Sequence, residues 1–249
     1  MVRRAWSQLV RKQWLILYPL AVAVIDTLAF FAVYAAGGEH LRWTEFFTAN
    51  FDRGQYLHDH FFSGFSFTPT LGFAIVAGVA ACLGAALIRA PYFRAIAGPR
   101  YPLAPRRWAE VVNLLVLYVF TNIVADVVLL PAPTKGLGAI ALLAVTEVIL
   151  ILLVFADYVI VFEELTFLAA LRRSVQLVRH RWQAVLVIVI VFNLVVIGFN
   201  SLYSHYYNGQ GTIFILLPVS QILLEAFVTL LVDLALIFLY EDIRRQSPA

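Results

Sequence analysis

The sequence predicts an all-α polytopic membrane protein with six transmembrane helices, short amphipathic helices at the membrane surface and both termini in the cytoplasm. Its 249 residues are 62% hydrophobic and only 13% charged, with a mean hydropathy of +0.87. Soluble domains average about 45–50% apolar and about 25% charged residues. The apolar residues form six runs, and the Lys and Arg residues cluster between alternate pairs of runs.

Each apolar run is long enough to cross the hydrocarbon core, which takes about 20 helical residues. The predicted spans are residues 14–36, 69–90, 111–131, 137–158, 182–200 and 213–240. The first run exceeds the roughly 7–15 residues of a signal-peptide core, so we expect it to be retained. No low-complexity linker interrupts the chain, and we expect residues 1–249 to form one domain.

The orientation follows from the distribution of basic residues, because loops rich in Lys and Arg stay in the cytoplasm. Of the 18 Lys and Arg residues, 15 lie in the N-terminus, the two loops after spans two and four, and the C-terminal tail. Arg42, Arg53 and Lys135 lie on the opposite side. We therefore expect residues 37–68 to form an outer loop. The Ala- and Arg-rich composition is typical of high-GC bacterial genomes, so the expected location is a bacterial cytoplasmic membrane.

A basic, Trp-ended phrase occurs twice, each time before an outward-going span. Residues 8–14 read QLVRKQW, residues 176–182 read QLVRHRW, and a weaker echo ends at Trp108. Either an old duplication of parallel repeats or convergence explains the match, because Trp and Arg both suit the membrane interface.

Residues 163–181 predict an amphipathic helix that lies on the inner leaflet. One face carries Phe167, Leu168, Leu171, Val175, Val178 and, beyond it, Trp182. The other face carries the residues expected to bind anionic lipid headgroups, namely Arg172, Arg173 and Arg179.

The segment EELTFLAALRRSVQLVRHRW also resembles the signature of a loose group of bacterial six-span membrane proteins. The group includes the YciC-like proteins and the membrane domain of some glycerophosphoryl diester phosphodiesterases. The matching residues are Glu163, Ala170, Leu171, Arg173, Ser174, Leu177 and Trp182. Thr166 and Val175 depart from the pattern, and no phosphodiesterase domain is present. The resemblance implies a six-span fold more than a function.

Polar residues within the predicted spans form a candidate intramembrane path. They are Asp26, Asn122, Asp126, Glu147, Asn193, Gln221, Glu225, Thr229 and Asp233, of which the last four follow one another at intervals of four. A central ionised Asp costs about 2.5–3.5 kcal/mol, so these side chains should face inward. Arg89 is assigned to the loop after span two, so no Lys or Arg lies within a predicted span to neutralise these acids. We expect Asp157 to be interfacial.

These residues favour a transport or permeation component with an acid-lined path. The alternative is a structural or accessory protein that organises lipids or partner proteins. Because no G-x-S-x-G, H-E-x-x-H or P-loop motif occurs, we expect no enzyme, although an intramembrane protease built on Asp26 with Asp126 or Asp233 stays open. The sequence indicates no cofactor, metal or nucleic-acid site. The bilayer and its anionic headgroups are the expected partners, and a protein partner or homo-oligomer is left open.

Overall fold

The computed structural model describes residues 12–36, 69–98, 108–129, 137–207 and 216–246, and every element in these ranges is a helix. A short 3-10 helix, η1 (Gln13–Ile16), leads into α2 (Leu17–Ala36). The remaining helices are α5 (Pro69–Ala97), α6 (Trp108–Leu129), α7 (Leu137–Leu152), α8 (Ala156–Phe162), α9 (Phe167–His180), α10 (Trp182–Tyr207) and α11 (Leu216–Gln246).

Within the described ranges, four stretches are helical, long and apolar enough to cross a membrane. They are Gly72–Ala97, Ala144–Phe162, Trp182–Phe199 and Ile222–Gln246. Two shorter apolar helices are Gln13–Ala29 and Trp108–Val124. The all-helical class is thus confirmed, with four helices that could cross a membrane, while the count of six spans and the orientation stay predictions. The predicted outer loop, 37–68, lies outside the described residues.

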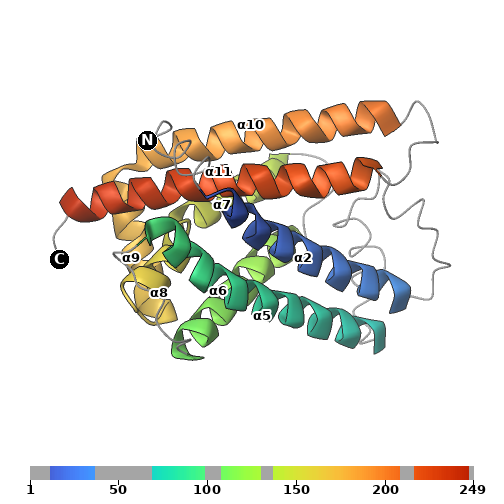
Figure 1. The fold of residues 1–249 in the computed structure, drawn as a ribbon, viewed down its shortest axis with the longest axis horizontal. Helices are drawn as coiled ribbons and strands as arrows, with labels where there is room; N and C mark the ends of the chain where they lie inside the picture. The colour runs from blue at the N-terminus through green and yellow to red at the C-terminus, as the bar shows by residue number, and fades with distance from the viewer. Residues whose placement is uncertain (1–11, 37–68, 99–107, 130–136, 208–215, 247–249) are drawn as a thin grey trace.

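The helices gather at one end of the molecule and spread apart toward the other (Figure 1). α2 packs along α5, α11 packs against α2 and α10, and α6 contacts α5, α7, α8 and α9. The C-terminal ends of α5 and α11, the start of α10, and α8 with α9 lie together at the left of Figure 1. We call this the closed end.

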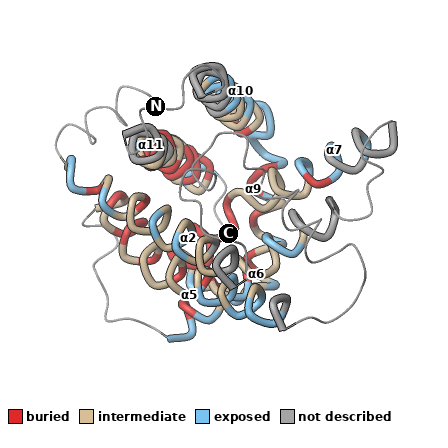
Figure 2. The backbone as a smooth tube through the Cα atoms, turned by 90° about the vertical axis from the view of Figure 1, so that its right-hand side faces the viewer, coloured by how far each residue is buried: buried red, intermediate tan, exposed pale blue. Residues whose placement is uncertain are grey.

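Most of the core comes from α8, α9 and the C-terminal halves of α5 and α11, which lie at the closed end, and Figure 2 shows α11 with buried segments and α10 with exposed ones. α8 is buried along its whole length, and Tyr92, Phe93, Leu177 and Tyr240 are almost fully enclosed. The opposite halves of the helices expose large apolar side chains instead. These include Leu28, Ile75, Val76, Ile123, Leu194, Ile197 and Leu223. An apolar surface of this extent is typical of a protein that contacts lipid.

α5 continues to Ala97, beyond the predicted end of the second span at residue 90. The apolar pattern persists through Tyr92, Phe93 and Ile96, and the helix contains Pro91. It ends at Gly98, whose φ of 79° is in the left-handed region that favours glycine. Arg89 therefore lies inside a helix rather than in a loop, so the expectation of spans without Lys or Arg is wrong.

The predicted fourth span is broken into α7 and α8 by a turn at residues 153–155. Ser174 on α9 is fully buried at this break. Its Oγ donates to the Leu152 carbonyl at 2.8 Å and accepts from the Phe155 N–H at 3.2 Å. Irregular backbone within a membrane is tolerated where protein groups satisfy it, and Ser174 supplies that compensation.

Replacing Ser174 with Ala is expected to destabilise the protein, because it leaves both backbone groups without their side-chain partner. Each unsatisfied buried group costs about 1–3 kcal/mol. The loss is measured as a lower thermal midpoint in detergent. Ser201→Ala, at an exposed position on α10, is the matched control and should melt like the wild type. Equal midpoints for both variants would contradict the role of Ser174.

The helix predicted at 163–181 is present as α9, but it buries a different side from the predicted one. Ala170, Ser174, Leu177 and Val178 are buried, whereas Leu168 is 65% exposed. α9 packs against α8 and also contacts α6, α7, α10 and α11. Its orientation follows from the break in span four, because Ser174 must face inward to reach it. α9 is therefore an integral part of the helical bundle.

Candidate functional site

A charged cluster lies inside the closed end, where α5, α8 and α11 meet. Arg89 Nη1 on α5 is 3.6 Å from Asp157 Oδ2 on α8. The Arg89 guanidinium also lies 5.5 Å from the centre of the Tyr118 ring on α6. Asp157 is only 9% exposed, and its Oδ1 accepts the Tyr158 N–H at 2.9 Å. Asp157 is therefore buried within the protein beside a cation, while its predicted position at the membrane interface stays a prediction.

Asp233 on α11 completes the cluster. It is 6% exposed, and its Oδ1 accepts a hydrogen bond of 2.9 Å from the Tyr158 hydroxyl. Arg89 attracts Asp233 as well as Asp157, so one guanidinium serves two carboxylates. Its position reduces the cost of holding both acids away from water.

A cavity of about 180 Å³ adjoins this cluster between α2, α5 and α11. Its polar lining comes from Tyr18, Asp26, Arg89, Tyr92, Thr229 and Asp233. Its apolar lining comes from Pro19, Val22, Ala23, Ile88 and Ala226. Asp26 is exposed, so the cavity opens on its side, whereas Tyr92 and Asp233 form a buried wall. The volume holds on the order of six water molecules, at about 30 Å³ each.

Three of the nine predicted path residues meet at this cavity: Asp26, Thr229 and Asp233. Thr229 and Asp233 are the C-terminal pair of the polar repeat on α11, and both line the same wall of the cavity. The N-terminal pair, Gln221 and Glu225, also lies on α11, but these two side chains are outside the described set.

The other predicted path residues lie elsewhere. Asn122 on α6 is exposed and donates from Nδ2 to Cys82 Sγ at 3.1 Å. Glu147 on α7 is exposed, and Asn193 on α10 is half-buried. Asp126 is on α6, with its side chain outside the described set. Of these four, the three whose side chains are described, Asn122, Glu147 and Asn193, do not line the cavity.

Two further ion pairs hold the closed end together. Arg94 Nη2 on α5 lies 2.6 Å from Glu110 Oε2 on α6, and both side chains are only 7% exposed. Glu163, just after α8, accepts a hydrogen bond of 2.7 Å from the Tyr240 hydroxyl and lies 3.4 Å from Arg173 Nε. These pairs fix the helices that carry the Arg89 cluster.

Lys12 joins the chain before η1 to the end of α5. Its Nζ donates to the Ala95 carbonyl at 2.8 Å, in the last turn of that helix. A cation at a helix C-terminus is favourable, because the last carbonyls carry partial negative charge.

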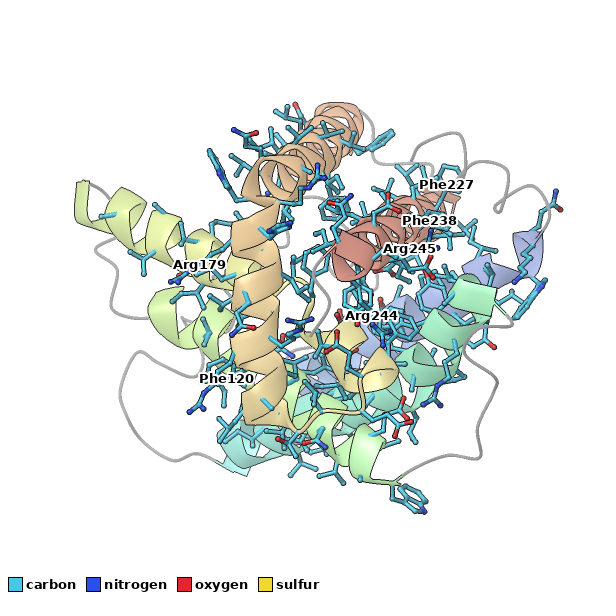
Figure 3. All side chains as sticks on the ribbon, turned by 90° about the vertical axis from the view of Figure 1, so that its left-hand side faces the viewer. Phe120, Arg179, Phe227, Phe238, Arg244 and Arg245 are labelled. Carbon is cyan, nitrogen blue, oxygen red and sulfur yellow. The ribbon has the colours of Figure 1, made fainter. Side chains whose placement is uncertain are left out.

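The three predicted headgroup arginines differ in their surroundings. Arg172 and Arg179 are exposed, whereas Arg173 is partly buried against Glu163. Figure 3 views the closed end and shows Arg179 on α9, with Arg244 and Arg245 at the end of α11. Trp14, Trp108 and Trp182, which precede the spans predicted to run outward, are all exposed. This arrangement suits a membrane interface.

The sequence contained a signal for Arg89 that the loop assignment obscured. Tyr92 follows it by three residues, so both lie on one helical face, and the apolar run continues to Ala97. No comparable local signal exists for the pairing of Asp157 with Arg89, which are 68 positions apart.

Among the described residues, the site brings three carboxylates, those of Asp26, Asp157 and Asp233, near the Arg89 guanidinium in apolar surroundings. Carboxylates in such surroundings favour a nearby proton or cation, since an isolated negative charge is costly away from water. Within the described residues no group of three His, Cys, Asp or Glu side chains is placed to hold a metal ion. Comparison with protein-family models, curated proteins and solved structures finds no match for this chain.

Proposed function

We propose that this chain is a transport or permeation component of a bacterial cytoplasmic membrane, with six spans and both termini inside. The cavity between α2, α5 and α11 is its polar site. The observation that carries the proposal is the meeting of Asp26, Arg89 and Asp233 at one cavity among apolar helices. Intramembrane acids are rare and costly, and they commonly mark ion or proton pathways.

The discontinuous helix beside the site supports the same proposal. Many transporters build their sites where a membrane helix is interrupted, because the break frees polar groups near the substrate. Here α7 ends at Leu152, and α8 places Asp157 next to Arg89. The resemblance of residues 163–182 to the YciC-like group supports the six-span arrangement and leaves the substrate open.

Flux through reconstituted liposomes tests the proposal. Proton and monovalent-cation fluxes are measured for the wild type and for Asp233→Asn, which keeps an oxygen that accepts the Tyr158 hydrogen bond. Asp233→Asn should lower flux at least tenfold, since it removes the charge that attracts a cation. Asp242→Asn makes the same chemical change farther along α11 and should match the wild type. Absence of flux in the wild type, or equal flux in all three proteins, contradicts transport.

The second candidate function is a membrane scaffold that organises anionic lipids or partner proteins. It is favoured by Arg172 and Arg179, which α9 exposes at the closed end. A protein that passes no ion but retains anionic lipid through these two arginines would support the scaffold over the transporter.

Cysteine labelling tests the orientation. In a Cys82→Ala background, Tyr56→Cys should react with a membrane-impermeant maleimide added outside intact cells, whereas Gln176→Cys should react only after lysis. Gln176 is chosen because it is exposed on α9. A cysteine at the buried position 174 would be shielded from the maleimide on either side of the membrane. Labelling of position 176 in intact cells would overturn the proposed topology.

A further inference from the structure

We infer that Asp233 on α11 holds one exchangeable proton beside an ionised Arg89–Asp157 pair, and that this proton enters through water in the cavity between α2, α5 and α11. The inference rests on the proposed function and deepens it, because it names the proton as the ion that the polar site binds.

The buried cluster contains one more acid than base. The Arg89 guanidinium lies 3.6 Å from Asp157 and also attracts Asp233, so a single positive charge serves two carboxylates. Asp157 and Asp233 are only 9% and 6% exposed. With both acids ionised, the cluster would carry a net negative charge away from water, which is costly. Two carboxylates that share one site avoid this cost when one of them is protonated.

The other charged groups of the described residues around the cluster do not supply the missing positive charge. Arg94 and Arg173 each pair with a glutamate, and Lys12 binds a backbone carbonyl. Asp26 has an interaction of its own and, as an acid, adds no positive charge. α10 brings no titratable group among its described side chains. The titratable groups that face the two acids are Tyr18 and Asp26 on α2, Arg89 and Tyr92 on α5, Tyr118 on α6 and Tyr158 on α8.

The hydrogen-bonding partners place the proton on Asp233 rather than on Asp157. Asp157 is bound by the Tyr158 backbone N–H and by Arg89, and because both groups can only donate, they favour an ionised carboxylate. Asp233 instead meets hydroxyl groups, those of Tyr158 at 2.9 Å and of Tyr92, which lies close enough for a second hydrogen bond. A hydroxyl group accepts as well as donates, so it can turn to accept the hydrogen bond of a protonated Asp233.

The same contacts favour a proton over a metal cation. A bound metal ion needs several oxygen ligands at once, whereas a proton needs one. The carboxylates of Asp157 and Asp233 already have partners, and no group of three His, Cys, Asp or Glu side chains in the described ranges is placed to hold a metal. Asp233 lines the cavity of about 180 Å³, which has room for water, and Asp157 does not. The cavity therefore gives protons access to Asp233.

Infrared spectroscopy of the purified full chain in detergent at neutral pH tests the inference, because a protonated carboxyl group has a carbonyl band that an ionised one lacks. Carbon-13 labelling of the aspartate side chains identifies the band as aspartate. The wild type should show a protonated aspartate, and Asp233→Asn should lose it. Asp157→Asn should lose it too, since Arg89 then pairs with an ionised Asp233. Asp26→Asn and Asp242→Asn are the controls and should keep it.

Deuterium exchange tests the route and uses the wild-type carboxyl group, so it does not depend on the folding of Asp233→Asn. Transfer to D₂O should shift the band to lower frequency. Ala226→Leu places a larger side chain in the cavity that Ala226 lines, and it should slow this shift several-fold. Ala141→Leu makes the same change at an exposed position on α7 and should exchange like the wild type.

Each other outcome overturns the inference. A wild type without a protonated aspartate shows that both acids of the cluster are ionised. A band that survives in Asp233→Asn, or that disappears only in Asp26→Asn, places the proton on another residue. Exchange in Ala226→Leu as fast as in the wild type shows a route other than the cavity. Because these measurements need no transport, a protonated Asp233 without liposome flux would refute the proposed function and leave the proton site. Flux with an ionised Asp233 would do the reverse.

Discussion

Arg89→Gln is expected to destabilise the protein by about 3–5 kcal/mol, the cost of breaking a buried ion pair by removing one partner. The substitution leaves Asp157 without the cation that lies 3.6 Å away and removes the charge that attracts Asp233. The loss is measured by reversible unfolding in mixed micelles. Arg245→Gln is the control, because Arg245 is 55% exposed and pairs with Glu241 only across one helical turn. That control should cost about 0.3–0.5 kcal/mol.

A double-mutant cycle separates this pairing from a general effect of losing Arg89. Adding Asp157→Asn to Arg89→Gln removes the orphaned charge, so the double variant should be more stable than the sum of the two single losses predicts. Strictly additive losses would show that Arg89 and Asp157 do not interact in the folded protein.

Glu110→Leu is expected to lower stability by a similar amount, about 3–5 kcal/mol, by stranding the Arg94 guanidinium. The two groups are 2.6 Å apart and each is only 7% exposed, so water compensates little for the loss. Unfolding in mixed micelles again gives the measurement. The double variant Arg94→Met with Glu110→Leu should recover most of the loss, because apolar residues of similar size often replace a buried pair without penalty. A double variant less stable than Glu110→Leu would show that the charges hold α5 and α6 together in a way that apolar packing cannot replace.

The helical segments were predictable because the bilayer imposes a simple rule. A run of about 20 apolar residues must satisfy its own backbone, and a helix does so. The ends and breaks were less predictable. The basic residues near position 90 suggested a loop, yet α5 continues to Ala97. The break after Leu152 is stabilised by Ser174, which lies on a different helix. No hydrophobic pattern around Ser174 or Leu152 indicates this contact.

The site was predictable in part for the same reason. Thr229 and Asp233 are four residues apart, so they share a helical face, and Asp26 joins them because α2 packs against α11. The pairing of Arg89 with Asp157 required the packing of α5 against α8, which no local pattern encodes. The sequence pattern alone predicted buried acids without a basic partner, whereas the tertiary structure places Arg89 beside them.

Ser174 couples the position of α9 to that of the buried Arg89–Asp157 pair. Its hydroxyl group hydrogen-bonds the backbone on both sides of the break, and Asp157 follows Phe155 by only two residues. A displacement of α9 must therefore either rupture these two bonds or carry the start of α8 with it, which changes the separation of Asp157 from Arg89. α9 also exposes Arg172 and Arg179. Forces applied to the exposed side of α9 thus reach the Arg89–Asp157 pair through Ser174 and through the packing of α9 on α8.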